Sequence, residues 1–259
     1  MDSRIKFIGL LELEAETPLV IVGGRFGNLL RTLRLPSGEL LIPSSTWKGV
    51  FRRLAETLAS TLQTEKNLAS TPSVDPEHFR ETLKRIGYSE EEINTEELRD
   101  ELLKKYFEYH DPVGKLFGNQ VRAGSLRFLD TVFKADTIIK AGIGIDRETD
   151  TVAENALYML EAIPPGTRLR LIVIGELDAP GDPASTLLAG MLEYAADLGV
   201  NIGARKSVGY GLLRLVEEKC RFYIIKYAED TTHGEVLANP FEKLKPLGLK
   251  EFVQHITRG

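Results

Sequence analysis

One loop of the sequence combines the residue types that bind polyanions. The segment Gly203-Ala-Arg-Lys-Ser-Val-Gly-Tyr-Gly211 holds three glycines, two adjacent cations and one aromatic residue. Glycines permit positive φ and a close backbone approach, while Arg205 and Lys206 can meet phosphates and Tyr210 can stack on a base. A glycine-rich turn with solvated cations is the alternative. The loop is not a Walker phosphate loop, because its lysine precedes a strand instead of opening a helix.

A second segment places hydroxyls and cations at the start of an expected helix. In Ile42-Pro-Ser-Ser-Thr-Trp-Lys-Gly-Val-Phe-Arg-Arg-Leu54, Ser44 or Ser45 can cap the helix. Free backbone N–H groups at a helix N-terminus bind anions, and Lys48 follows within one turn. Lys48 and Arg52 share one face. The alternative is an ordinary amphipathic helix, whose apolar face consists of Trp47, Val50, Phe51, Leu54 and Leu58.

Other site chemistry has little support in the sequence. The single cysteine, Cys220, excludes an internal disulfide and a cysteine-cluster zinc site. The four histidines lack metal-ligand spacing. Ser44 and Ser45 lack a convincing histidine partner, which disfavours a serine hydrolase. Asp146, Glu148 and Asp150 cluster and could bind a cation, although a solvated loop is the more frequent explanation.

Charge is distributed unevenly along the chain. The 259 residues have a formal net charge of -5, yet residues 20–55 carry +5 and residues 88–111 carry -6. This arrangement suits a basic RNA-binding face with a separate acidic appendage, although a solvated face is the simpler explanation for the acidic run. No apolar run approaches the roughly 20 residues that cross a bilayer. We therefore expect a cytoplasmic protein with no membrane partner.

The hydrophobic periodicity predicts a particular order of strands and helices. Helices are expected from residues 44 and 183, and strands at 4–14, 125–133, 169–177 and 212–216. The order βαββαβ predicts an α+β fold, a ferredoxin-like (RNA-recognition-like) antiparallel sheet with both helices on one face. Such sheets commonly bind RNA, but the fold alone does not decide function.

The remaining segments are expected to be additions to this core. The expected parts are the core at 1–62 and 113–228, an acidic helical insertion at 63–112, a thumb-like hairpin at 142–157, and a weakly patterned C-terminal extension at 229–259. Within the insertion, one helix is expected from Ser89 to about Tyr106. A turn is expected at 111–118.

Three motifs, in this order, resemble those of one family. Ile42-Pro-Ser-Ser-Thr-Trp-Lys-Gly49 with Arg52-Arg53 is similar to a motif of isoleucine, proline, serine, lysine and glycine in the RAMP superfamily of CRISPR effector proteins. Leu116-Phe-Gly118 resembles that family's leucine-phenylalanine-glycine, and the loop at 203–211 resembles its carboxy-terminal glycine-rich loop. The resemblance covers most of residues 4–217.

The resemblance is closest to backbone subunits of type III effector complexes. It implies a structural subunit in antiviral defence that binds guide RNA (crRNA), with target RNA, other RAMP subunits and the rest of the complex as partners. A thumb containing Ile145, Asp146 and Arg147 would insert between guide and target. The implied RNA-binding residues are Arg25, Ser44, Ser45, Lys48, Arg52, Arg53, Gly203, Arg205, Lys206, Gly209 and Tyr210.

One departure from the family pattern bears on catalysis. Target-cleaving members carry an aspartate in a loop before the proline-serine motif, but residues 30–38 contain none, and Arg34 or Leu35 stands about there. Neither metal coordination nor activation of a 2′-hydroxyl then has an obvious provider, and Glu39 is a weak substitute. We therefore favour a noncatalytic chain without a cofactor. The alternative is a Mg²⁺-dependent endoribonuclease subunit that cleaves target RNA.

Two further classes of enzyme are less favoured. A guide-processing nuclease of the same superfamily needs a histidine as general acid, and the histidines here fall outside the positions where that class would need one. A small-molecule enzyme that holds a nucleotide phosphate in the glycine loop would bind mononucleotides tightly. An RNA-binding subunit instead needs several nucleotides and loses affinity steeply with salt.

Overall fold

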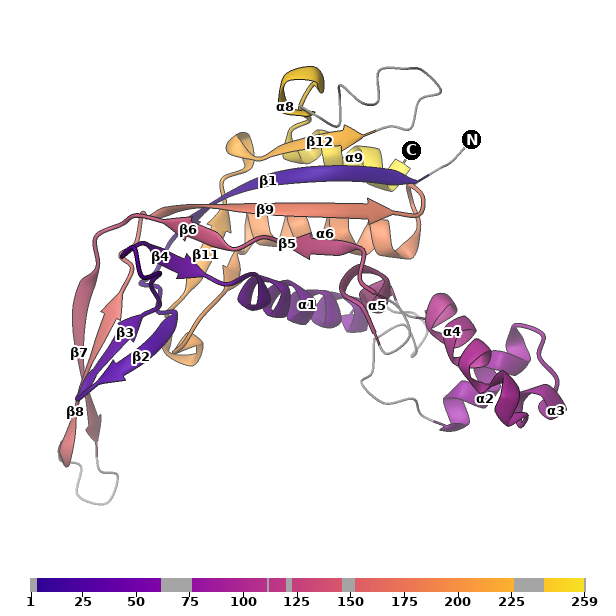
Figure 1. Cartoon of the computed structure of the whole chain (residues 1–259), viewed down its shortest axis with the longest axis horizontal. Coiled ribbons are helices and arrows are strands. Elements are labelled where there is room, and N and C mark those ends of the chain that lie inside the picture. The colour runs from indigo at the N-terminus through magenta and orange to yellow at the C-terminus, as the bar shows by residue number, and fades with distance from the viewer. Residues whose placement is uncertain are drawn as a thin grey trace.

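An antiparallel six-stranded sheet forms the centre of the protein (Figure 1). The computed structural model describes residues 4–61, 76–110, 112–119, 123–145, 152–225 and 240–258. The sheet runs β10-β11-β1-β9-β5, and β12 pairs with β1 as well. Its strands are β1 (Ile5–Ala15), β5 (Leu126–Phe128), β9 (Arg168–Leu177), β10 (Val200–Asn201), β11 (Leu212–Leu215) and β12 (Arg221–Ile225).

The strand order confirms the ferredoxin-like fold. In chain order the four main strands are β1, β5, β9 and β11, and in the sheet β11 lies beside β1, β1 beside β9, and β9 beside β5. Helix α1 (Ser44–Thr61) lies between β1 and β5 in the chain, and α6 (Pro183–Asp197) lies between β9 and β11. The βαββαβ order predicted from hydrophobic periodicity is therefore correct.

Alternating burial explains how the sheet and helices pack. Every second residue of β1, including Phe7 and Leu11, is buried, and its neighbours are half-buried. Phe51 of α1 and Met191 of α6 surround the same small void as Phe7, Leu11 and Val173 of the sheet. Both helices therefore cover one face of the sheet, as the sequence predicted, and leave the other face open.

Helix α6 begins and ends as its sequence predicts, whereas α1 begins at Ser44 itself, so neither Ser44 nor Ser45 precedes the helix as its cap. The Asp182 carboxylate accepts a hydrogen bond from the Ser185 backbone N–H at 2.6 Å, and Pro183 occupies the first turn of α6. Gly199 follows with φ +78°, which few other residues tolerate. Helix α1 is fixed by Trp47, whose buried indole N–H donates to the Thr131 hydroxyl at 3.0 Å.

A second sheet forms an arm that projects beyond the helices (Figure 1). Its order is β2-β3-β8-β7, and β3 pairs in parallel with β8. The strands are β2 (Val22–Phe26), β3 (Leu29–Thr32), β7 (Ile138–Ile145) and β8 (Val152–Ala162). The expected hairpin at 142–157 is therefore longer, and the basic segment after residue 22 adds two strands to it. A small sheet of β4 (Leu40–Ile42) and β6 (Thr131–Phe133) lies separately from it.

The insertion contains several short helices instead of one long helix. They are α2 (Pro76–Arg85), α3 (Glu90–Ile93), the 3-10 turn η1 (Glu96–Leu98) and α4 (Arg99–His110), around Leu83, Ile93 and Leu102. The prediction of one helix from Ser89 was wrong. The side chains of Asn94 and Thr95 bond back to the carbonyls of Glu90 and Glu91, both at 2.8 Å, and this competes with continuation of the helix.

Two further segments differ from their expected structure. The turn expected at 111–118 is helix α5 (Pro112–Phe117), which buries Leu116 and Phe117 and ends at Gly118 with φ +89°. The tail contains α8 (Pro240–Lys243) and α9 (Leu249–Arg258). Phe252 of α9 is fully buried and stacks on Phe222 with ring centroids 4.0 Å apart, so α9 belongs to the main core.

Two 3-10 turns complete the described elements, η2 (Lys206–Val208) within the glycine loop and η3 (Glu217–Lys219) before β12. Among the described helices, none combines the length and apolar character required to cross a membrane.

Candidate functional site

A hollow of about 450 Å³ lies where α1 meets the glycine loop and the end of α6. Ser45 and Arg53 line it from α1, and Gly203 and Lys206 line it from the loop. Four of the residues implied as RNA-binding, from segments about 150 positions apart, therefore share one site. Its described lining residues include no carboxylate: Ser45, Thr46, Gly49, Val50, Arg53, Leu54, Thr57, Tyr194, Gly199, Val200, Asn201, Gly203 and Lys206.

The glycines of the loop serve mainly to bring it against its own chain. A Cβ at Gly203 would lie 2.3 Å from the Val20 carbonyl oxygen, and one at Gly211 would lie 2.0 Å from that of Ile202. Gly203 and Gly211 also have φ of +83° and +84°. Both glycines are thus required by the fold. Gly209 also has positive φ, but a Cβ there would meet no atom within 4 Å, so packing does not require it.

Arg205 links the loop to the arm. Among the described residues other than glycine, it alone has a positive φ, with φ 62° and ψ 28°. Its Nη1 donates to the Tyr158 hydroxyl at 2.7 Å, and the guanidinium lies 4.1 Å from the centroid of that ring. Strained backbone of this kind persists only when its surroundings hold it. The arginine therefore positions the loop, while the neighbouring Lys206 remains exposed.

The N-terminus of α1 carries an anion that belongs to the protein itself. The Ser44 backbone N–H donates to the Asp130 carboxylate at 2.6 Å. This hydrogen bond, with another from the Ser44 side chain, holds the pKa of Asp130 below its usual value. The anion site expected from the helix N-terminus is thus already engaged with Asp130, and Ser45 rather than Ser44 lines the hollow.

The cations of α1 have different surroundings. Arg52 donates to the Glu56 carboxylate and to the Gly118 carbonyl, both at 3.1 Å, and so ties α1 to the end of α5. The Arg53 side chain is 83% exposed, with Glu56 3.8 Å away. Lys48 is exposed. Arg53 and Lys48 are therefore better placed than Arg52 to meet an external phosphate.

Several implied residues lie away from the hollow. Arg25 lies on β2 of the arm and donates to the Gly27 carbonyl at 2.9 Å. Tyr210 is a half-buried residue of the loop and does not line the hollow. Ile145 ends β7, as expected for the thumb, whereas Asp146 and Arg147 lie outside the described residues.

Arg34, which stands about where the family's aspartate is expected, has a structural role here. Arg34 donates to the Glu161 carboxylate of β8 at 2.6 Å, which joins the segment after β3 to the base of the arm. Glu39 accepts from Ser37 at 2.8 Å and lies 3.9 Å from Lys134. In the described part of the chain, no three histidine, cysteine or acidic residues are grouped so as to hold a metal ion.

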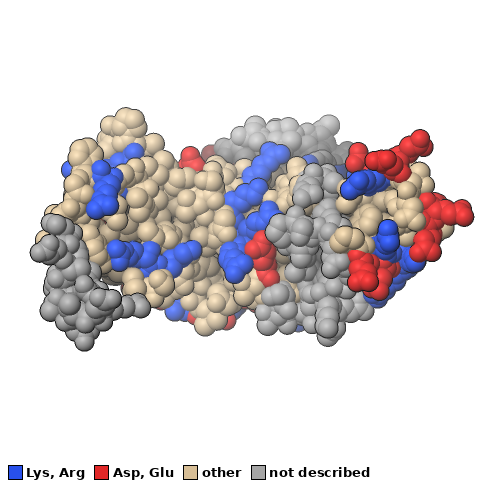
Figure 2. Space-filling model, turned by 90° about the horizontal axis from the view of Figure 1, so that it is seen from below, with Lys and Arg blue, Asp and Glu red and all other residues tan. Residues whose placement is uncertain are grey.

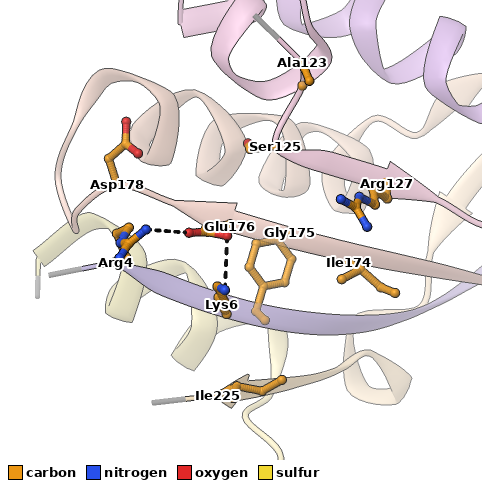
Figure 3. A pocket seen from close by; sticks show the side chains of 12 residues that line it. Arg4, Lys6, Ala123, Ser125, Arg127, Ile174, Gly175, Glu176, Asp178 and Ile225 are labelled. Carbon is orange, nitrogen blue, oxygen red and sulfur yellow. Dashed lines mark hydrogen bonds and ion pairs between the residues drawn. The ribbon is translucent and has the colours of Figure 1, made fainter. Parts of the chain in front are cut away.

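A second hollow, of about 480 Å³, lies on the open face of the central sheet (Figure 3). Arg4 and Lys6 both reach the Glu176 carboxylate at 3.5 Å, as the dashed lines show. Asp178 in the same lining pairs with Lys115 at 3.4 Å. Because its acids partly neutralise its cations, this hollow attracts a polyanion less strongly than the hollow beside α1.

The surface charges follow the same division. Figure 2 shows lysine and arginine side chains over the arm and the middle of the molecule, whereas most of the aspartate and glutamate lies at the end formed by the insertion, together with further cations. The acidic run noted in the sequence therefore lies at one end of the molecule. A polyanion approaching this face is attracted to its middle and repelled from its acidic end.

Several lining residues were not assigned to the site by sequence reasoning. Among them are Tyr194, near the end of α6, and Asn201, on β10. Tyr194 is 36% exposed although it belongs to a mainly buried helix. The available sequence signal for Tyr194 was a large aromatic residue among the small and aliphatic residues of this helix. No local signal marks Asn201.

Comparison with known protein families places the chain in one of them. The family model of the RAMP superfamily matches residues 12–214, which include the end of β1, α1, the arm and the glycine loop. No curated protein matches the chain.

Proposed function

The chain belongs to the RAMP superfamily, and from this premise we propose that it is a guide-RNA-binding structural subunit of a type III CRISPR effector complex. The family indicates a CRISPR-associated RNA-binding role. Beyond this role, we propose that the ligand is the guide RNA and that the chain belongs to a type III complex. Its other proposed partners are target RNA and other RAMP subunits.

The hollow between α1 and the glycine loop carries this proposal. It brings Arg53 and Lys206 together beside the hydroxyl of Ser45, with no acidic residue in its described lining. The Arg53 side chain is 83% exposed, with the Glu56 carboxylate 3.8 Å away, so it can still meet a phosphate. Contacts of such cations with phosphates hold RNA without reading its sequence. The neighbouring arm, attached through Arg205 and Tyr158, then projects beside the bound strand, as a thumb between guide and target would.

A matched pair of variants tests the RNA-binding site. We expect Arg53→Ala combined with Lys206→Ala to weaken binding of a single-stranded guide RNA, whatever its sequence. The slope of log affinity against log salt should fall by about 0.7 for each lost phosphate contact. Lys219→Ala removes an exposed cation of η3 outside the hollow and should leave the affinity unchanged. Equal affinity for the double variant and the wild type would remove this hollow from the RNA path.

Target cleavage is tested on the assembled complex. With Mg²⁺ and a complementary target RNA, a structural subunit leaves the target uncut at its own positions. Cutting at regular spacing that disappears with Glu39→Ala or Asp146→Ala would instead establish the metal-dependent nuclease. The ion pair of Arg34 with Glu161 favours the structural role, because Arg34 stands about where the catalytic acid is expected and instead binds the base of the arm.

A further inference from the structure

We propose that the hollow beside α1 is a pocket for one nucleoside unit, which accepts a base turned out of the bound strand. The proposal rests on the RNA-binding role argued above and adds to it. Contacts with phosphates alone need only an exposed basic surface. This hollow is instead lined by an aromatic ring and several apolar side chains, which phosphates do not need.

The lining divides into an apolar part and a polar part. Val50 and Leu54 of α1, Val200 of β10 and the Tyr194 ring form surfaces suited to the face of a base. Asn201 has an exposed amide that can both donate to and accept from the edge of a base. Arg53 and Lys206 provide cations for the flanking phosphates. Aromatic and apolar surface together with a few polar groups is the usual composition of a small-ligand site.

Gly49 supplies an independent observation. It lies inside α1, where glycine weakens a helix, and a Cβ there would meet no atom within 4 Å. Packing within the protein therefore does not require a glycine at this position. Gly49 lines the hollow, so the missing side chain leaves room for a ligand against the helix backbone. The volume of about 450 Å³ lies within the range of pockets that enclose small organic ligands.

The test separates recognition of bases from recognition of phosphates. The full chain is titrated with an oligouridylate of about 12 nucleotides and with an abasic ribose-phosphate strand of the same length. We expect Tyr194→Ala to weaken binding of the oligouridylate about tenfold, because stacking on an aromatic ring is lost. Its affinity for the abasic strand should not change.

Two further variants control for helix and surface effects. Tyr194→Phe keeps the ring and should bind both strands as the wild type does. Leu198→Ala removes an exposed apolar side chain, 60% exposed and one turn further along, that does not line the hollow, and it should also have no effect. Melting curves establish that each variant is folded.

The possible results have distinct meanings. A loss confined to Tyr194→Ala and to the base-bearing strand supports the pocket. If Tyr194→Ala binds both strands as tightly as the wild type, the pocket for a base is refuted while RNA binding stands. If the wild-type chain binds neither strand, the proposed RNA-binding function fails, and this inference fails with it.

Discussion

The guanidinium of Arg205 lies 4.1 Å from the centre of the Tyr158 ring and donates a hydrogen bond to its hydroxyl at 2.7 Å. These residues belong to different parts of the protein, the glycine loop and the arm. The tyrosine ring also crosses Gly142 on the neighbouring strand, where an added Cβ would lie 2.2 Å from a ring atom. A three-residue contact thus sets the position of the loop relative to the arm.

We predict that this contact is energetically coupled. Tyr158→Phe should lower the free energy of unfolding by about 1 kcal/mol through loss of the hydrogen bond, and Tyr158→Leu should lower it by about 1–2 kcal/mol. A double-mutant cycle of Tyr158→Leu with Arg205→Ala, measured by urea unfolding, isolates the pair. Additive effects would contradict a direct link between loop and arm.

Asp130 is predicted to stabilise the start of α1 and to oppose RNA binding. Asp130→Ala removes the acceptor for the Ser44 N–H and should cost about 1 kcal/mol of unfolding free energy. Asp130→Asn retains an acceptor oxygen, so its loss should be smaller. Both changes remove a negative charge beside a basic helix, and guide-RNA affinity at low salt should rise slightly. A drop in affinity for the Asn variant would show that the carboxylate contributes to binding.

Glu161 is predicted to hold the base of the arm in a pH-dependent way. Burial raises the pKa of Glu161, but hydrogen bonds from Arg34, Thr137 and Thr32 outweigh it and keep the pKa below its usual value. A lowered pKa means that the stabilisation is complete above the unfolded value, near 4.5, and is lost as pH falls through the folded value.

The corresponding experiment compares two glutamates. Glu161→Gln should lower the free energy of unfolding at pH 7 by about 1.5–3 kcal/mol, since charged hydrogen bonds are lost, and the difference should shrink below about pH 4. Glu176→Gln changes an exposed carboxylate of the open sheet face, 3.5 Å from Arg4 and Lys6, and should cost under about 1 kcal/mol. A constant difference between wild type and Glu161→Gln across this pH range would contradict the assignment.

Local patterns predicted the core elements because their signals lie within a few residues. The Asp182-Pro183 start of α6, the Gly199 stop and the alternation along β1 are of this kind. Helix α9 has a comparable signal that was overlooked. Leu249, Phe252, Val253 and Ile256 repeat at helical spacing and are all buried.

Long-range pairings could not be predicted in the same way. The parallel pairing of Leu29 with Met159 connects strands about 130 residues apart, and no local periodicity encodes it. The site shows the same limit. Residue type alone predicted Arg53 and Lys206 as RNA-binding residues, and both line the hollow. The sequence could not show that Arg52 bonds to Gly118 and Ser44 to Asp130, because these partners are distant in the sequence.

Gly49 provides the sharpest test, because it separates stability from binding. Gly49→Ala adds a Cβ that meets no protein atom, and alanine favours a helix over glycine by about 1 kcal/mol. The melting temperature should therefore rise. RNA affinity should fall, since the added methyl group enters the hollow. Proteins often trade stability for function at a binding site in this way.

Gly190 is the matched control. It is also a glycine within a helix whose Cβ would meet no atom within 4 Å, but it does not line the hollow. Gly190→Ala should raise the melting temperature by a similar amount and leave RNA affinity unchanged. If Gly49→Ala also keeps full affinity while it raises the melting temperature, no ligand approaches this part of α1, and the glycine has no role in binding.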